Sequence, residues 1–203
     1  MHISEGVLSA PVLISGAGLT LAGTAVGLKR LDFDRVPQVA VLSAVFFVAS
    51  LVHVPIGPSS VHLILNGLLG VLLGWVAFPS ILIGLTLQAL LFQYGGLTSL
   101  GVNTLNMALP AVTCYYLFGR GIMSDRAYIA TVASFLAGFG AILLASLMLG
   151  LSLFLTGDSF SGAARVIIAA HLPVMIIEGL ITAVCIQFLK KVRPEIMGMA
   201  YGR

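Results

Sequence analysis

Residues 127–156 read AYIATVASFLAGFGAILLASLMLGLSLFLT, thirty consecutive residues without one charged side chain. An α-helix needs about 20 predominantly apolar residues to cross the hydrocarbon core of a bilayer. This stretch is bounded by Arg126 on one side and by Gly157-Asp158 on the other. It therefore predicts a membrane-spanning helix with defined ends.

The composition of the whole chain agrees with this stretch. Of 203 residues, 59% are hydrophobic and 8% are charged, with a mean hydropathy of +1.12. Soluble domains carry about 25% charged residues, so the chain could not cover a water-exposed surface. The net charge of +3 is dispersed along the chain and does not indicate a nucleic-acid partner. We expect a single integral-membrane domain over residues 1–203, embedded in a lipid bilayer.

Apolar runs between charges and turn residues predict an all-α, polytopic bundle of about seven helices. The third and fourth predicted spans could instead form a tight or re-entrant hairpin. The predicted spans are 7–28, 36–53, 60–78, 80–94, 104–119, 127–156 and 166–189.

The basic residues predict the orientation of the bundle, because cytoplasmic loops are enriched in Lys and Arg. If the spans alternate in direction, only Arg165 falls on one face. The other nine share the opposite face: Lys29, Arg30, Arg35, Arg120, Arg126, Lys190, Lys191, Arg193 and Arg203. We therefore place the C-terminus in the cytoplasm and the N-terminus outside. The first residues carry no basic side chain, unlike a secretory signal, so we expect Met1 to remain on the mature protein.

All four histidines are then predicted to lie in the outer half of the membrane or above it. A terminal amine followed by histidine can chelate one ion through the amine of Met1 and the amide and Nδ1 nitrogens of His2. One further imidazole completes a four-nitrogen site, which favours Ni(II) or Cu(II), with Co(II) also compatible. Judged by predicted depth in the membrane, His62 is the first choice for that fourth donor. His53 and His171 are the second choices.

Simpler interpretations compete with a metal site. A histidine after an initiator methionine is common, and His53 fits a helix end at the membrane interface. His171 and Glu178 share a helix face and could be interhelical polar contacts. Their alternative role, together with Asn103, is to support metal ligands from outside the coordination sphere.

A stripe of small residues marks the first predicted span: Gly16, Thr20, Gly23 and Gly27. Such a stripe lets another helix approach closely. That helix could belong to this chain or to a partner subunit.

Four segments together resemble the CbiM/NikM family, the substrate-binding membrane subunits (S components) of energy-coupling-factor importers for cobalt and nickel. They are Met1-His2-Ile3-Ser4-Glu5-Gly6-Val7-Leu8, Gly57-Pro58-Ser59-Ser60-Val61-His62-Leu63, Gly95-Gly96-Leu97-Thr98-Ser99-Leu100-Gly101-Val102-Asn103, and His171-Leu172-Pro173 through Glu178-Gly179.

The resemblance implies seven transmembrane helices with an outside N-terminus, in a multi-pass protein of the inner (plasma) membrane. It implies that residues 1–6 form a tail that folds back into the bundle and binds the metal. The implied ligands are the Met1 amine, the His2 amide and ring, and the His62 ring. The resemblance implies Co²⁺ or Ni²⁺ as the transported ion, with overall likeness favouring cobalt, and a link to cobalamin biosynthesis.

The resemblance also implies partners: a transmembrane coupling (T) subunit, a pair of cytoplasmic ATPases and, in some systems, a small accessory membrane subunit. The chain has no Gly-x-x-x-x-Gly-Lys-Ser/Thr phosphate-binding motif, so ATP hydrolysis would take place on a partner. We expect no enzymatic activity and no catalytic cofactor. The alternatives are a passive cation channel, supported only by Glu178, and an intramembrane metalloenzyme built on Ser60 and His62.

Overall fold

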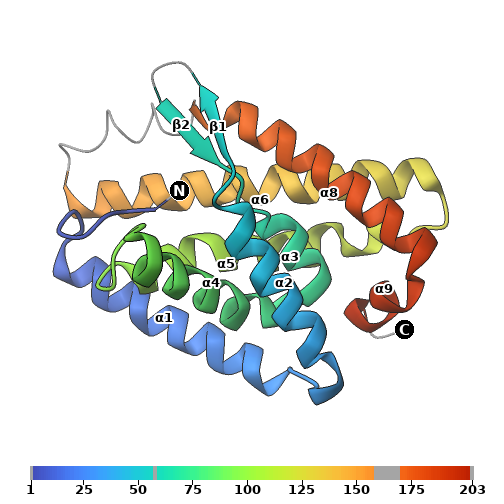
Figure 1. Cartoon of the computed structure of the whole chain (residues 1–203), viewed down its shortest axis with the longest axis horizontal. Helices are drawn as coiled ribbons and strands as arrows, with labels where there is room; N and C mark the ends of the chain where they lie inside the picture. Colours follow the sequence, from blue (N-terminus) through green and yellow to red (C-terminus); the bar gives the residue numbers. More distant parts are fainter. Residues whose placement is uncertain (1, 57–58, 158–169, 202–203) are drawn as a thin grey trace.

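The fold is a bundle of α-helices with one short β-hairpin at its edge (Figure 1). It is known from a computed structural model that describes residues 2–56, 59–157 and 170–201. The all-α membrane architecture predicted from the sequence is confirmed, and the hairpin is the addition to it.

The first half of the chain forms short and long helices in alternation. Helix α1 covers Ala10–Lys29 and is followed by the 3-10 turn Phe33–Arg35 and by α2, Val36–Ala49. Strands β1 (His53–Ile56) and β2 (Ser59–His62) come next. Helix α3 (Asn66–Leu73), the 3-10 turn Gly74–Val76 and α4 (Ala77–Phe92) complete this half.

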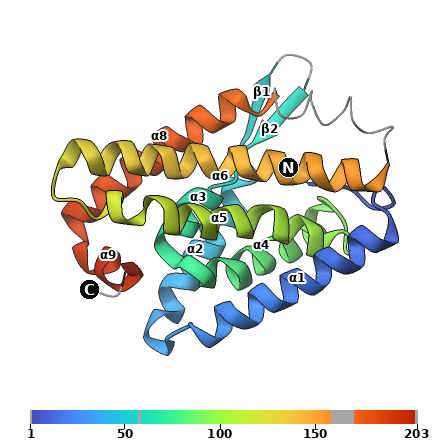
Figure 2. The same cartoon turned by 180° about the vertical axis from the view of Figure 1, so that it is seen from behind.

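The second half contains the longest helices. They are α5 (Leu100–Ile122), α6 (Ala127–Thr156) and α8 (Leu172–Val192), and the short α9 (Pro194–Tyr201) follows them. Helix α6 has the bounds that its apolar run predicts. Figure 2 shows α5 and α6 lying side by side along the long axis of the molecule.

Contacts between helices show that the chain direction alternates as predicted. The Asn66 side chain donates to the carbonyl of Met107, and Gly70 packs on the backbone of Ala111, so α3 runs parallel to α5. At Gly74, where φ is +55°, the chain reverses. Helix α4 then returns until Gly95 lies against Asn103 at the start of α5. The third and fourth predicted spans therefore form a tight hairpin.

The third span differs from its prediction because the helix starts at Asn66 and not at residue 60. Ser59–His62 pairs antiparallel with His53–Ile56, so His53 lies opposite His62 in the register. Leu65 has a φ of +55°, which only a few per cent of non-glycine residues adopt. Helix α2 likewise ends at Ala49 and not at residue 53. The predicted seventh span began at 166, whereas α8 begins at Leu172, and residues 166–169 lie outside the described part.

The small-residue stripe on α1 serves packing within this chain. A Cβ on Gly16 would meet Val102, one on Gly23 would meet Phe78, and one on Gly27 would meet Pro79. Thr20 donates to the carbonyl of Gly101 at 2.6 Å. The alternative that the stripe docks a partner helix is therefore wrong, because α4 and α5 already cover it.

The outward faces of the helices are apolar. Ile14, Val184 and Phe188 are 74%, 69% and 61% exposed, as expected for side chains that face lipid and not water. Four helical stretches of the described chain are long and apolar enough to cross a membrane: Ala10–Lys29, Asn66–Phe92 (which turns at Gly74), Ala127–Thr156 and Leu172–Val192.

Described basic residues gather at one end of the bundle, where α5 and α8 finish. The Lys190 ammonium donates to the carbonyls of Ile122 and Ser124, both at 2.8 Å. From the connection between α1 and α2, Arg35 donates to the carbonyl of Leu72. The N-terminal tail lies at the opposite end, where the amide of Ser9 meets Thr156 at the end of α6.

Candidate metal-binding site

The N-terminal tail folds back into the bundle and is fixed there through the backbone of Ile3. The Asn103 side chain contacts this residue twice: its Oδ1 accepts from the Ile3 amide at 2.9 Å, and its Nδ2 donates to the Ile3 carbonyl at 3.0 Å. The Ser99 hydroxyl donates to the same carbonyl at 2.7 Å. Ile3 is 5% exposed and Asn103 is 2% exposed. A short segment without secondary structure is thus held by the start of α5.

A second attachment lies nearer the surface, at Glu5. Its carboxylate accepts from the backbone amide of Thr98 at 3.0 Å and from the Thr98 hydroxyl. These hydrogen bonds lower the pKa of Glu5 below its usual value of 4.5. A Cβ on Gly96 would fall 2.4 Å from the Glu5 side chain, so this close approach requires glycine. Together, Asn103 and Thr98 fix the position of the residue that precedes both contacts, His2.

His2 lies inside the bundle with its ring between α4 and β2. Its Nε2 is 2.7 Å from Oε1 of Gln88 on α4. Its ring is stacked on that of His62, with centroids 4.9 Å apart, and lies 6.2 Å from that of Tyr94. Burial lowers the pKa of His2 from 6.5 to about 3, and the hydrogen bond with Gln88 opposes this with a smaller effect. The imidazole is therefore neutral at pH 7, the form that can bind a metal.

His62 is the last residue of strand β2, and its ring is the one stacked on the ring of His2. Its Nδ1 lies 3.0 Å from the carbonyl of Leu63, an arrangement that places the proton on Nδ1 and the lone pair on Nε2. Glu178 of α8 holds the segment that follows. Its carboxylate accepts from the amide of Ile64 at 2.5 Å and from the amide of Leu65 at 3.0 Å. Glu178 is fully buried, so α8 fixes where the strand turns into α3.

The structure brings some of the predicted site residues together and separates others. His2 and His62 meet, Asn103 holds the tail, and Glu178 acts on the chain after His62. His171 is a buried residue that precedes α8. Met1 and the His53 side chain lie outside the described part. Within that part, no three His, Cys, Asp or Glu side chains gather as a metal site.

Three contacting residues were not identified from the sequence: Gln88, Ser99 and Thr98. Gln88 is a lone amide in the apolar run of α4, where hydropathy averages conceal it. A signal did exist, since a polar side chain within a span is costly and calls for a partner. Its partner is 86 positions away, so the sequence does not indicate which residue it is.

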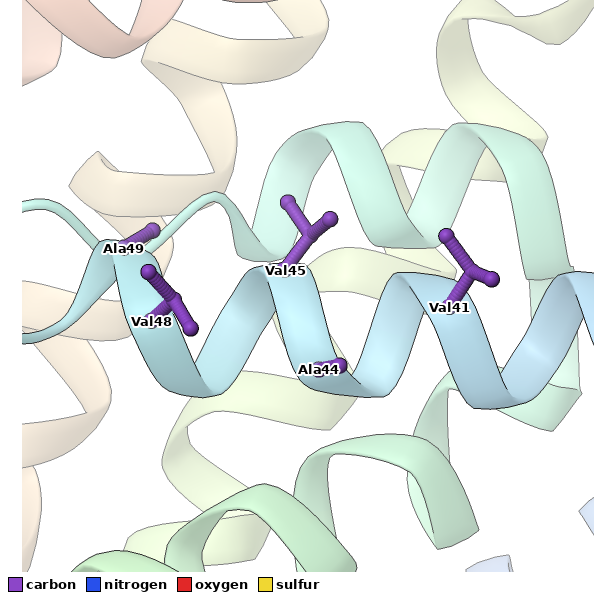
Figure 3. Close-up of a pocket in the computed structure, with 5 residues that line it drawn as sticks. All are labelled: Val41, Ala44, Val45, Val48 and Ala49. Atoms are coloured by element: carbon purple, nitrogen blue, oxygen red, sulfur yellow. The ribbon is translucent and has the colours of Figure 1, made fainter.

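Hollows on the surface differ in their chemistry. One of about 430 Å³ lies beside the tail and is lined by Ser4, Glu5 and Gln93 among others. Another, of about 440 Å³, is a shallow groove along α2 (Figure 3). It is lined by apolar side chains alone: Val41, Ala44, Val45, Val48 and Ala49. This groove offers no side-chain ligand for a metal, whereas the hollow beside the tail has polar side chains.

Comparison with known proteins defines the class as a membrane transport protein. A Haemophilus influenzae protein, provisionally named a metal transport protein, is 44% identical over 202 residues, and the match covers 97% of each chain. The cobalt transport protein CbiM of Sorangium cellulosum is 32% identical, covering 97% and 94%. The fused nickel transport protein NikMN of Rhodobacter capsulatus is 31% identical, and the match spans 64% of that longer protein.

Structure agrees with sequence. A crystal structure of a transition metal transporter superposes with a TM-score of 0.75 and 29% identity, covering 95% of this chain and 93% of that one. Residues 2–196 match the CbiM family, described as the cobalt uptake substrate-specific transmembrane region. The chain belongs to the CbiM family. It is a transmembrane transport protein for cobalt or nickel and not an enzyme.

Proposed function

We propose that this chain is the substrate-capture subunit of an energy-coupling-factor importer and binds Co²⁺ or Ni²⁺ at its N-terminus. The proposed ligands are the amine of Met1, the amide and Nδ1 nitrogens of His2, and the ring of His62. The observation that carries the proposal is the insertion of the tail, which places His2 against His62, 4.9 Å between ring centroids.

The donor set suits a late first-row ion. With metal–nitrogen bonds of about 2 Å, two nitrogens that share an ion are at most about 4 Å apart. The His2 and His62 rings, with centroids 4.9 Å apart, would have to turn their nitrogens toward that ion. The His2 hydrogen bond uses Nε2, so Nδ1 remains for the chelate with the preceding amide. Imidazole and amide nitrogens favour Ni(II), Cu(II) or Co(II) over Ca²⁺ or Mg²⁺. Among these, we favour cobalt or nickel because relatives are named for those metals.

The importer requires partners that this chain does not supply. Since the sequence has no phosphate-binding loop, a pair of cytoplasmic ATPases and a transmembrane coupling subunit would provide the energy, with a small accessory membrane subunit in some assemblies. The membrane would be the plasma membrane, with the basic end of the bundle in the cytoplasm. The tail would then meet metal on the outside.

Uptake into proteoliposomes tests this function. We expect the chain alone to bind Co²⁺ or Ni²⁺ without accumulating it, and accumulation to require the coupling subunit, the ATPases and ATP. Rapid accumulation by the chain alone, down a gradient and without ATP, would instead indicate a passive cation channel. Binding that leaves the vesicle interior empty under every condition would refute transport through this assembly.

A further inference from the structure

Gln88 is a fully buried amide in the last turn of α4, and the ligand set proposed above does not use it. Its Oε1 lies 2.7 Å from Nε2 of His2, whereas its own Nε2 has no partner among the described residues. Its backbone carbonyl accepts from the amides of Gln93 and Tyr94, which end the helix. The side chain is thus anchored at its base and aimed at one atom of the tail.

We propose that Gln88 is a positioning residue that fixes the tautomer and orientation of the His2 ring. A neutral imidazole carries its proton on one nitrogen only. When the Gln88 carbonyl oxygen accepts a hydrogen bond from Nε2, the proton resides there and the lone pair resides on Nδ1. Only Nδ1 can close a chelate ring with the preceding backbone amide, so the acceptor on α4 selects the nitrogen that binds metal.

The opposite arrangement would prevent chelation. If the Gln88 amide nitrogen donated to Nε2 of His2, the proton would move to Nδ1 and block the nitrogen nearest the backbone. Gly95 lies close to the tail on one side of the ring, since a Cβ there would lie 3.5 Å from His2 and 3.0 Å from Asn103. His62 is stacked on the face of the His2 ring and Gln88 contacts its Nε2, so the Gln88 atom that makes this contact decides which ring nitrogen carries the proton.

This inference rests on the proposed function, but its first test needs no metal. Nitrogen-15 NMR of histidine side chains in the metal-free protein distinguishes the two tautomers, and His2→Ala identifies the resonance. We expect wild-type His2 to be protonated on Nε2. Protonation on Nδ1 would overturn the proposal, even if the protein binds Ni²⁺ tightly. Conversely, absence of Ni²⁺ binding by the wild type would refute the function and leave the tautomer result intact.

Three variants separate positioning from general packing. Gln88→Met keeps the length of the side chain but removes the acceptor, so we expect mixed tautomers and a 10- to 100-fold loss of Ni²⁺ affinity, as for other residues that orient a metal-bound histidine. Gln88→Glu keeps an acceptor, as a carboxylate oxygen, and should preserve the proton on Nε2 of His2. Gln187→Met on α8 is the matched control, since its amide nitrogen also lacks a described partner but lies far from the tail.

The outcomes are separable even where a variant is unstable. If Gln88→Met does not fold, the wild-type tautomer and the Gln88→Glu affinity decide the question. If Gln88→Met folds and its His2 tautomer and Ni²⁺ affinity match the wild type, Gln88 does not position the ring. An equal loss of affinity in Gln187→Met would show a nonspecific effect of the substitution and would equally overturn the proposal.

Discussion

Removing the side chain that holds the tail, in Asn103→Leu, should weaken metal binding without touching a proposed ligand. Leucine has a similar size but cannot replace the two hydrogen bonds with Ile3, at 2.9 and 3.0 Å. The lost bond to the Ile3 carbonyl is worth about 1 kcal/mol, and leaving the buried Ile3 amide unsatisfied costs about 2 kcal/mol. Ser99 still donates to the carbonyl, so we add no penalty for that oxygen.

The sum is about 3 kcal/mol of tail docking, which corresponds to roughly a 100-fold loss of affinity if binding requires the docked tail. Calorimetric titration of Ni²⁺ into protein with its native N-terminus measures this directly. Hydrogen exchange of the Ile3 amide in the metal-free protein should rise in parallel. Asn106→Leu is the matched control, because Asn106 lies on the same helix and contacts Ser152 instead of the tail.

Affinity within threefold of the wild type, with unchanged exchange at Ile3, would refute the reasoning. It would mean that the tail docks through other contacts. An equal loss in Asn106→Leu would show that any amide removed from α5 has this effect, and that the clamp on Ile3 is not its cause.

Three further predictions concern other contacts. Glu178→Leu removes the buried oxygens that accept from the amides of Ile64 and Leu65 and should destabilise the fold by roughly 3 kcal/mol. Thermal unfolding measures this, and an unchanged midpoint would refute the contact. Hydrogen bonds from Thr98 lower the pKa of Glu5. The contact between Glu5 and Thr98 is therefore complete above pH 4.5, the ordinary pKa, and is lost as the pH falls through the lowered pKa. NMR titration should show a higher Glu5 pKa in Thr98→Val. In a protein without the native cysteines, a membrane-impermeant thiol reagent should label Leu97→Cys from outside and Asp34→Cys only after permeabilisation. The reverse pattern would show that the protein has the opposite orientation.

Hydrophobicity and charge predict most of the helical framework. The bounds of α6 follow from an apolar run between Arg126 and Gly157, because both lipid and packed helices exclude charge there. The proximity of the tail to His62 also follows from their predicted depth in the membrane. If the spans alternate in direction, both lie at the outer end of the bundle.

The β-hairpin could not be predicted in this way. Residues 53–62 read HVPIGPSSVH, whose prolines and glycine mark a break between two apolar runs, but periodicity does not separate a short strand from a helix end. What stops the helix before Asn66 is the conformation of Leu65 and the carboxylate of Glu178, 113 positions further along the chain. Such long-range partners, like the one that Gln88 finds in His2, arise only from the folded structure.

The central claim is that the terminal amine and His2 chelate the metal together with His62. Titration of Ni²⁺ and Co²⁺ into protein with its native N-terminus, compared with the same protein extended by one glycine before Met1, tests it most directly. The extension turns the Met1 amine into an amide, shifts the terminal amine by up to about 3.5 Å and makes histidine the third residue. We expect high-affinity binding to be lost on extension and in His2→Ala, and weakened in His62→Ala. Undiminished high-affinity binding by both the extended and the His2→Ala proteins would contradict the account.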